Sequence, residues 1–246
     1  MLAALAEGDW LAACAAMSSV GGITMPSYQD IGAAQSSLTG ITVAWPTHAT
    51  DDIALLVCSS GGTEPVTLAT ANGFAAVADS PQDTGVAASS GVALSVFWCR
   101  ATSAAMAAPV TNDSGNHQHG FIITFRWCVA SGNPWDVTAG DFLDTVSTTV
   151  TIPGDTTTVA NCLVVAICGH SVDDVVDVGQ FSGWANADLA NITERFDNST
   201  AVGGGSGLGI VTGEKAAAGA YAATTATLAT TSRQARMSIA LKGLGA

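Results

Sequence analysis

Cys162, Cys168 and His170 lie within nine positions of one another, and residues of these types could carry chemistry. Thiolates and an imidazole at short spacing can hold a zinc ion, and a cysteine beside a histidine can act as a nucleophile with its base. If the stretch is extended, however, Cys162 and Cys168 share a face but lie about 20 Å apart, because a strand rises ~3.3 Å per residue. A zinc ion requires its sulfur ligands within roughly 4 Å of each other, given Zn–S bonds of ~2.3 Å. The sequence therefore predicts that residues 161–169 form a central buried strand rather than a metal or nucleophile site.

A second pair of histidines, His117 and His119, is spaced so that both side chains lie on one face if the segment is extended. Such a pair can bind a metal, but the nearest acid is Asp113 and no third ligand is evident. We therefore interpret this segment as a solvated loop that enters a strand at residue 120. The glycine-rich stretch GGGSG at 203–207 lacks the following helix that a serine nucleophile elbow needs. We expect no enzymatic activity, no cofactor and no structural metal.

Apolar runs bounded by clusters of glycine, proline, asparagine, aspartate and serine predict the strands that must position these residues. The predicted strands are residues 41–45, 52–60, 91–101, 120–130, 147–152, 161–169, 207–215 and 235–243. In 120–130 the large apolar side chains at odd positions, from Phe121 through Trp127 to Val129, are predicted to share one face. Because no helical pattern separates the strands, the sequence predicts an all-β fold, an antiparallel β-sandwich of jelly-roll-like type.

Acidic residues dominate the charge of the chain, since twenty Asp and Glu face seven Lys and Arg and give a formal net charge of −13. Such a charge repels phosphate backbones and anionic lipid, so we expect neither nucleic-acid binding nor membrane-surface binding. The eight acids that precede Arg100 have no basic residue near them in the sequence and are interpreted as solvating groups. Only 11% of residues are charged, which is typical of a protein that sits against other subunits.

The six cysteines are even in number, but four of them lie inside apolar runs that predict strands. They are Cys14, Cys58, Cys99, Cys128, Cys162 and Cys168. A free thiol inside a strand behaves as a small core residue. We therefore expect all six to be reduced, which fits assembly in a cytoplasm.

Residues 1–17 are the one helical stretch that the sequence predicts, because alanine and leucine are strong helix formers. Glu7 and Asp9 interrupt its apolar run and no basic residue precedes them, which argues against a signal peptide. A lone helix of this length is marginal in water, so its apolar side needs a partner. We predict a helical attachment arm at 1–24 and a β-sandwich domain at 25–246. The predicted assembly contacts on the arm are Leu2, Leu5, Trp10 and Met17.

Short motifs in the predicted strands and turns occur in a distinctive order. They include Trp98 and Arg100; Asn133, Pro134 and Asp136; residues 161–165; Glu194, Arg195 and Asp197; and residues 237–242. This order resembles a family of tailed-bacteriophage virion proteins that are often described as minor tail or structural proteins. The resemblance covers about residues 25–243, and MPSYQDIG at 25–32 is similar to a usual start of the family.

The resemblance implies a jelly-roll-like sandwich displayed on a virion, and it transfers no catalytic residue. On this basis we expect a non-enzymatic structural protein on the particle exterior, either a tail-tip or fibre-type accessory or a capsid decoration protein. Its expected partners are other copies of itself and other virion proteins, in virions assembled in the cytoplasm of a bacterial host. The alternative is a carbohydrate-binding sandwich that recognises the host surface. Its candidate glycan contacts are Trp135 and Trp184, which the sequence places in loops.

Overall fold

The computed structural model describes residues 22–87, 90–173 and 179–246, and every regular element in those ranges is a β-strand. The predicted helix, with Leu2, Leu5, Trp10 and Met17, lies outside the described residues. All pairings between the described strands are antiparallel. The prediction of an all-β antiparallel sandwich is therefore confirmed.

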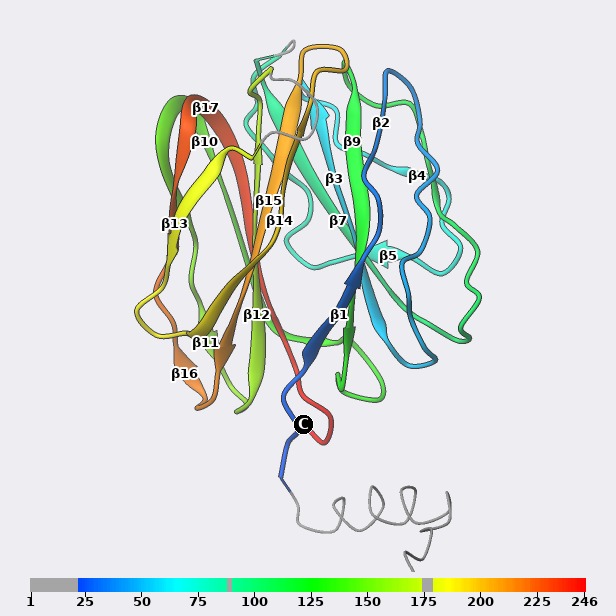
Figure 1. Ribbon diagram of the computed structural model, residues 1–246, viewed down its shortest axis with the longest axis vertical. Coiled ribbons are helices and arrows are strands. Elements are labelled where there is room, and N and C mark those ends of the chain that lie inside the picture. The colour runs from blue at the N-terminus through cyan, green and yellow to red at the C-terminus, as the bar shows by residue number, and fades with distance from the viewer. Residues whose placement is uncertain (1–21, 88–89, 174–178) are drawn as a thin grey trace, which may run out of the picture.

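The strands form two large sheets that face each other (Figure 1). The first sheet has the order β1-β9-β3-β7-β5, with β2 beside β9 and β6 beside β7. Its strands are β1 (Ser27–Ile31), β2 (Gln35–Ser37), β3 (Ile53–Gly61), β5 (Ala75–Ala76), β6 (Gln82–Asp83), β7 (Val92–Arg100) and β9 (Gln118–Arg126).

The second sheet has the order β10-β17-β12-β15-β14, with β13 beside β17. Its strands are β10 (Trp135–Ile152), β12 (Cys162–His170), β13 (Phe181–Ala185), β14 (Ala190–Thr200), β15 (Ser206–Lys215) and β17 (Thr224–Leu241). Two short pairs complete the fold: β4 (Leu68–Thr70) with β8 (Val110–Thr111), and β11 (Thr156–Thr157) with β16 (Gly219–Ala220).

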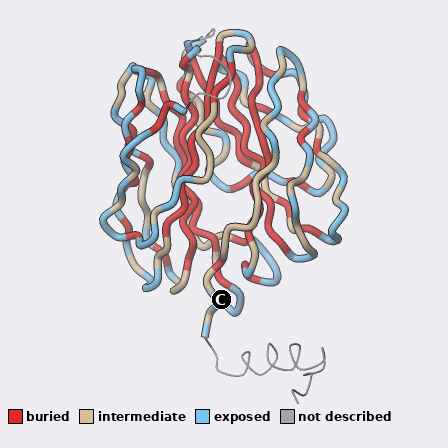
Figure 2. The backbone as a smooth tube through the Cα atoms, viewed as in Figure 1, coloured by how far each residue is buried: buried red, intermediate tan, exposed pale blue. Residues whose placement is uncertain are grey.

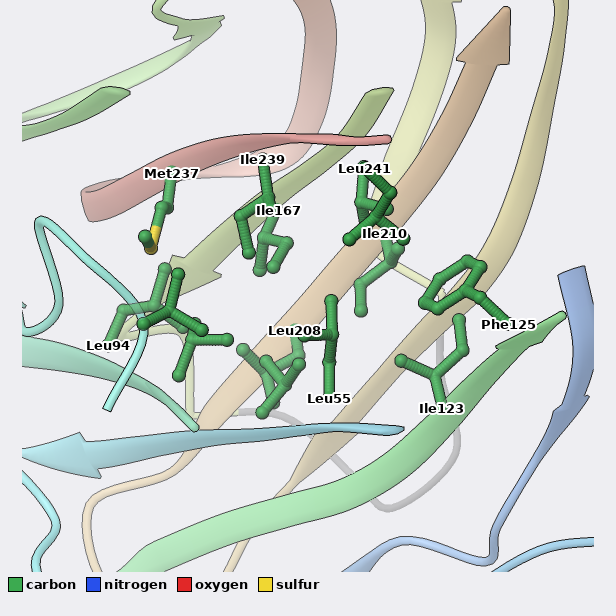
Figure 3. Close-up of a cluster of buried hydrophobic side chains, with 14 of the residues drawn as sticks. Leu55, Leu94, Ile123, Phe125, Ile167, Leu208, Ile210, Met237, Ile239 and Leu241 are labelled. Atoms are coloured by element: carbon green, nitrogen blue, oxygen red, sulfur yellow. The ribbon is translucent and has the colours of Figure 1, made fainter. Parts of the chain in front are cut away.

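The main hydrophobic core lies between the two sheets. Because side chains alternate along a strand, every second residue of the central strands points into this layer. Figure 3 shows Leu55 and Leu94 of the first sheet pointing toward Leu208 and Ile239 of the second. These four side chains are fully buried.

Separate hydrophobic clusters cover the outer faces of the central strands. Figure 2 accordingly shows long unbroken stretches of buried residues along these strands. All nine residues of β3 and all nine of β12 are buried. Cys168 packs in a cluster on the outer face of β12, while Val165 and Ile167 point into the main core. The interpretation of 161–169 as a central buried strand is thus confirmed.

The five cysteines within the described residues are free and buried, and Cys14 lies outside those residues. Burial raises the pKa of the Cys58 and Cys168 thiols to about 12, which suppresses the reactive thiolate. We expect a thiol reagent to find about six thiols in denatured, unreduced protein, one per cysteine, and far fewer in the folded protein. A titre of two or fewer after denaturation would contradict this expectation.

Several edge strands differ from the prediction. The strand predicted at 147–152 is the end of β10, which begins twelve residues earlier at Trp135. β14 and β1 were not predicted, whereas residues 41–45 form only a single bridge, from Thr42 to Val110. Edge strands carry polar side chains on their open sides, so they lack the apolar run by which a central strand is recognised.

Candidate functional site

Three histidines are buried at the end of the sandwich where β3 and β12 finish. His117, His119 and His170 are each at most 1% exposed. The interpretation of the segment around 117 as a solvated loop is therefore wrong. The His117 ring packs against Gly61, where a Cβ atom would lie 2.5 Å from the ring's Cε1. Because glycine has no side chain, the imidazole can occupy the space beside Gly61.

Hydrogen bonds tie this histidine cluster to the neighbouring strands. Nδ1 of His119 lies 2.8 Å from Oγ of Ser36, and the two residues face each other directly in the β2–β9 register. The hydroxyls of Ser59 and Ser206 are 3.1 Å apart and join β3 to β15 across the sandwich. The Ser36–His119 contact is thus a cross-strand hydrogen bond, of the kind that opposite residues in a sheet make.

His170 is held in its neutral form. Its Nδ1 accepts the N–H of Val172 at 3.2 Å, so the ring proton of the neutral form lies on Nε2, which packs against Gly207. Burial lowers the pKa of His170 to about 3, and the charge of His119 lowers it further. Burial also lowers the pKa of His117, against the opposing effect of Asp173. Lowered pKa values favour the neutral forms of His117 and His170, and the packing of these rings serves the fold.

Within the described ranges, no group of three or more His, Cys, Asp or Glu side chains is placed to hold a metal ion. His117 and His119 therefore have no third ligand within those ranges. The sequence-based expectation of no structural metal stays a prediction, which chelator treatment followed by thermal unfolding would test.

At the opposite end of the sandwich, Asp52 and Arg126 form an ion pair. The Nε and Nη2 atoms of Arg126 donate to Oδ1 and Oδ2 of Asp52 at 2.8 and 2.7 Å, and Ala49 N–H donates to Oδ2 at 2.8 Å. Hydrogen bonding to Asp52 raises the pKa of Arg126. Asp52 is only 1% exposed, so its interpretation as a solvating acid is wrong. The pairing could not be recognised from the sequence, because the two residues are 74 positions apart.

Both tryptophans proposed as glycan contacts lie in strands, so their placement in loops is wrong. Trp135 begins β10, and its ring meets Trp98 edge-on at 5.6 Å between centroids. Trp184 lies in β13 and stacks on Phe181 at 5.1 Å, while its Nε1 donates to Glu194 at 2.6 Å. Both side chains are half-buried. Glycan contact through them stays a prediction.

Trp127 is the one tryptophan among the described residues that is exposed, with 52% of its surface accessible. The alternation predicted for 120–130 stops at this residue, because its φ is 61°, in the left-handed region that non-glycine residues rarely adopt. Cys128, rather than Trp127 or Val129, continues the core face of β9. Trp127 lines a pocket of about 380 Å³ beside the Asp52–Arg126 pair.

No protein-family model, curated protein or solved structure that was compared with the chain matches it. The ranges that the structure describes contain no helix that is long and apolar enough to cross a membrane. The functional proposal below therefore rests on the positions and contacts of the residues.

Proposed function

We propose that the chain is a non-enzymatic structural protein on the exterior of a tailed-bacteriophage virion, built in as multiple copies. It would serve as a tail-tip or fibre-type accessory or as a capsid decoration protein. One observation carries the proposal: in two of the motifs behind the resemblance to that family, Asp136, Arg195 and Asp197 make contacts that hold the sandwich together. Motifs whose residues make contacts between strands and turns support a structural role.

The motif at residues 133–136 closes one end of the second sheet. The carbonyl of Pro134 accepts Lys242 N–H at 2.7 Å. The Asp136 carboxylate accepts the Thr158 hydroxyl at 2.7 Å and the Val159 N–H at 3.2 Å. These bonds fix the start of β10 against the segment that leads into β12.

The motif at residues 194–197 joins β14 to its surroundings. The Arg195 guanidinium lies 4.5 Å over the Tyr28 ring, and its Nε donates to Thr212 at 2.9 Å. The Asp197 carboxylate accepts the N–H groups of Gln180 and Phe181 at 2.8 and 2.9 Å. Each charged group of the motif, including Glu194 through its bond from Trp184, therefore has a partner within the fold, which supports a structural role.

The surface of β10 supports packing against further subunits. Phe142 and Val146 are 47% and 58% exposed, although both are large and apolar. β10 pairs with β17 and with no other described strand, so its second edge is open. Exposed apolar side chains on an open edge strand are typical of a surface that other chains cover.

Particle association tests the proposal. We expect mass spectrometry of density-gradient-purified particles, produced from the phage or prophage that carries the gene, to find this chain at many copies per particle. Treatment of intact particles with a protease should degrade it before internal proteins, because it lies on the exterior. Recovery of the chain in the soluble fraction alone would contradict the proposal.

Removal of the predicted arm is expected to leave the sandwich folded and to abolish incorporation into particles. The cut is placed after residue 21 rather than at the predicted boundary of 24, because Thr24 N–H donates to Leu244 O at 2.9 Å and Asn161 Nδ2 donates to Ile23 O at 2.7 Å. The measurements are the melting temperature of the shortened protein and its recovery in purified particles.

Two full-length variants test whether incorporation requires the apolar side of the arm or only the presence of the arm. Replacing Leu5 and Trp10 by serine should reproduce the loss of incorporation, whereas Glu7→Gln should not. Normal incorporation of the shortened protein would refute an attachment role for this segment.

A further inference from the structure

We propose that the pocket beside Trp127 is a saccharide-binding site. It lies at the end of the sandwich where β9 finishes and β3 begins, and it has a volume of about 380 Å³. Pockets that bind small ligands are usually ~300 Å³ or larger. The residues that matter are Asp51, Asp52, Arg126, Trp127 and Leu244. The inference goes beyond the structural role proposed above and does not depend on it.

The backbone around Trp127 fixes the indole toward solvent. The carbonyl of Trp127 accepts Leu244 N–H at 2.7 Å, and Val129 N–H donates to Lys242 O at 3.0 Å. Between them Cys128 forms a bridge with Gly243 and packs in the core. A left-handed tryptophan with a large exposed ring costs stability, and such conformations persist where the surrounding structure enforces them. The main chain at Trp127 is therefore fixed, and its exposed side chain lies beside the pocket that the residue lines.

A second residue that lines the pocket has the same rare conformation. Asp51 has a φ of 70° and is exposed. Its N–H donates to Ala101 O at 2.8 Å, and Ala101 N–H donates back to Asp52 O at 2.9 Å. These bonds fix the main chain at Asp51, an exposed residue that lines the pocket.

Arg126 supplies donors beside the indole. Its two bonds to Asp52 use two of the five N–H groups of a guanidinium and lock the orientation of the remaining ones. The Arg126 side chain is 35% exposed, and the residue lines the pocket. Donors and acceptors that are fixed before a ligand arrives lower the cost of binding it.

A flat aromatic ring flanked by a carboxylate and a guanidinium matches the chemistry of a sugar. One face of a pyranose presents C–H bonds, which lie favourably against the negative face of an indole. The hydroxyl groups around the ring edge can donate to Asp51 and accept from Arg126.

The alanine- and leucine-rich residues 1–21 would suit the pocket less well, although the chain enters the described part beside Leu244. This segment contains no basic side chain to pair with the Asp51 carboxylate, and burying an unpaired charge is costly. We therefore assign the pocket to a saccharide.

The test uses the full chain and a printed array of bacterial-surface oligosaccharides, followed by saturation-transfer NMR with the methyl glycosides of the sugars that bind. We expect the wild-type protein to bind at least one saccharide. Trp127→Ala should weaken binding roughly tenfold or more, through loss of the ring contact. Trp127→Phe should retain part of the binding, and Asp51→Asn should weaken it.

Phe142→Ala is the matched control, because it removes an exposed aromatic side chain of β10 that does not line the pocket. It should leave binding unchanged. The inference is overturned if the wild-type protein binds no saccharide, if Trp127→Ala binds as well as wild type, or if only Phe142→Ala loses binding. Binding of a peptide of residues 1–21 at the pocket, in the absence of any saccharide binding, would assign the pocket to the arm and likewise overturn the inference. None of these outcomes affects the particle-association test.

Discussion

Replacing Phe121 by alanine is expected to lower the free energy of unfolding by about 3–5 kcal/mol, the usual cost of deleting a buried phenylalanine side chain. Phe121 is fully buried in the core between the sheets. Its ring lies 3.8 Å from that of Phe196, centroid to centroid, so the pair joins β9 of the first sheet to β14 of the second. Equilibrium unfolding in urea, followed by tryptophan fluorescence, measures the loss.

Phe142→Ala is the matched control for this prediction, because it deletes the same side chain from a position that is 47% exposed. It should change stability by no more than about 0.5 kcal/mol. If the two variants lost similar stability, the core described between the sheets would be wrong.

Acidification is expected to destabilise the protein through His170. The pKa of this residue is lowered from 6.5 to about 3 in the folded state, mainly by burial and secondarily by His119. The unfolded chain therefore binds the proton first, so the stabilisation is complete above pH ~6.5 and is lost as the pH falls toward 3. At pH 4 the loss is about 3 kcal/mol, at ~1.4 kcal/mol for each pH unit below the ordinary pKa.

The variant His170→Asn isolates this contribution, since its side-chain oxygen can still accept the Val172 N–H while the group no longer titrates. The acidic residues and His117 titrate in both proteins, so their effects cancel in the comparison. We expect the stability of the variant to fall less steeply between pH 6.5 and 4 than that of the wild type. Parallel pH profiles would contradict the buried, neutral state of His170.

The central strands could be predicted from the sequence because burial on both faces makes them continuous apolar runs. β3, β7 and β12 lie within one or two residues of their predicted bounds. β14 could not be predicted, because its exposed positions carry polar side chains and it is recognised only by its pairing with β15. The first half of β10 was missed for the same reason, since it lies at an edge of its sheet.

The sites were harder to predict, because they depend on contacts between distant segments and on backbone conformation. Burial of His117 depends on the absence of a side chain at Gly61, 56 positions earlier. The exposure of Trp127 depends on a positive φ that no alternation of apolar residues reveals, and the alternation placed its ring in the core. Two polar residues that pair in space but are distant in the sequence, such as Asp52 and Arg126, cannot be recognised as a pair from the local sequence.

The central claim is that this chain forms part of the exterior of a virion, and imaging of labelled particles tests it most directly. A short metal-binding or epitope tag placed after Ala246, which is exposed, can be labelled with gold on intact particles. The account predicts a regular pattern of label at repeated positions on the outside of the capsid or the tail. Particles that carry no label, while the tagged protein is present and folded in the same lysate, would contradict it.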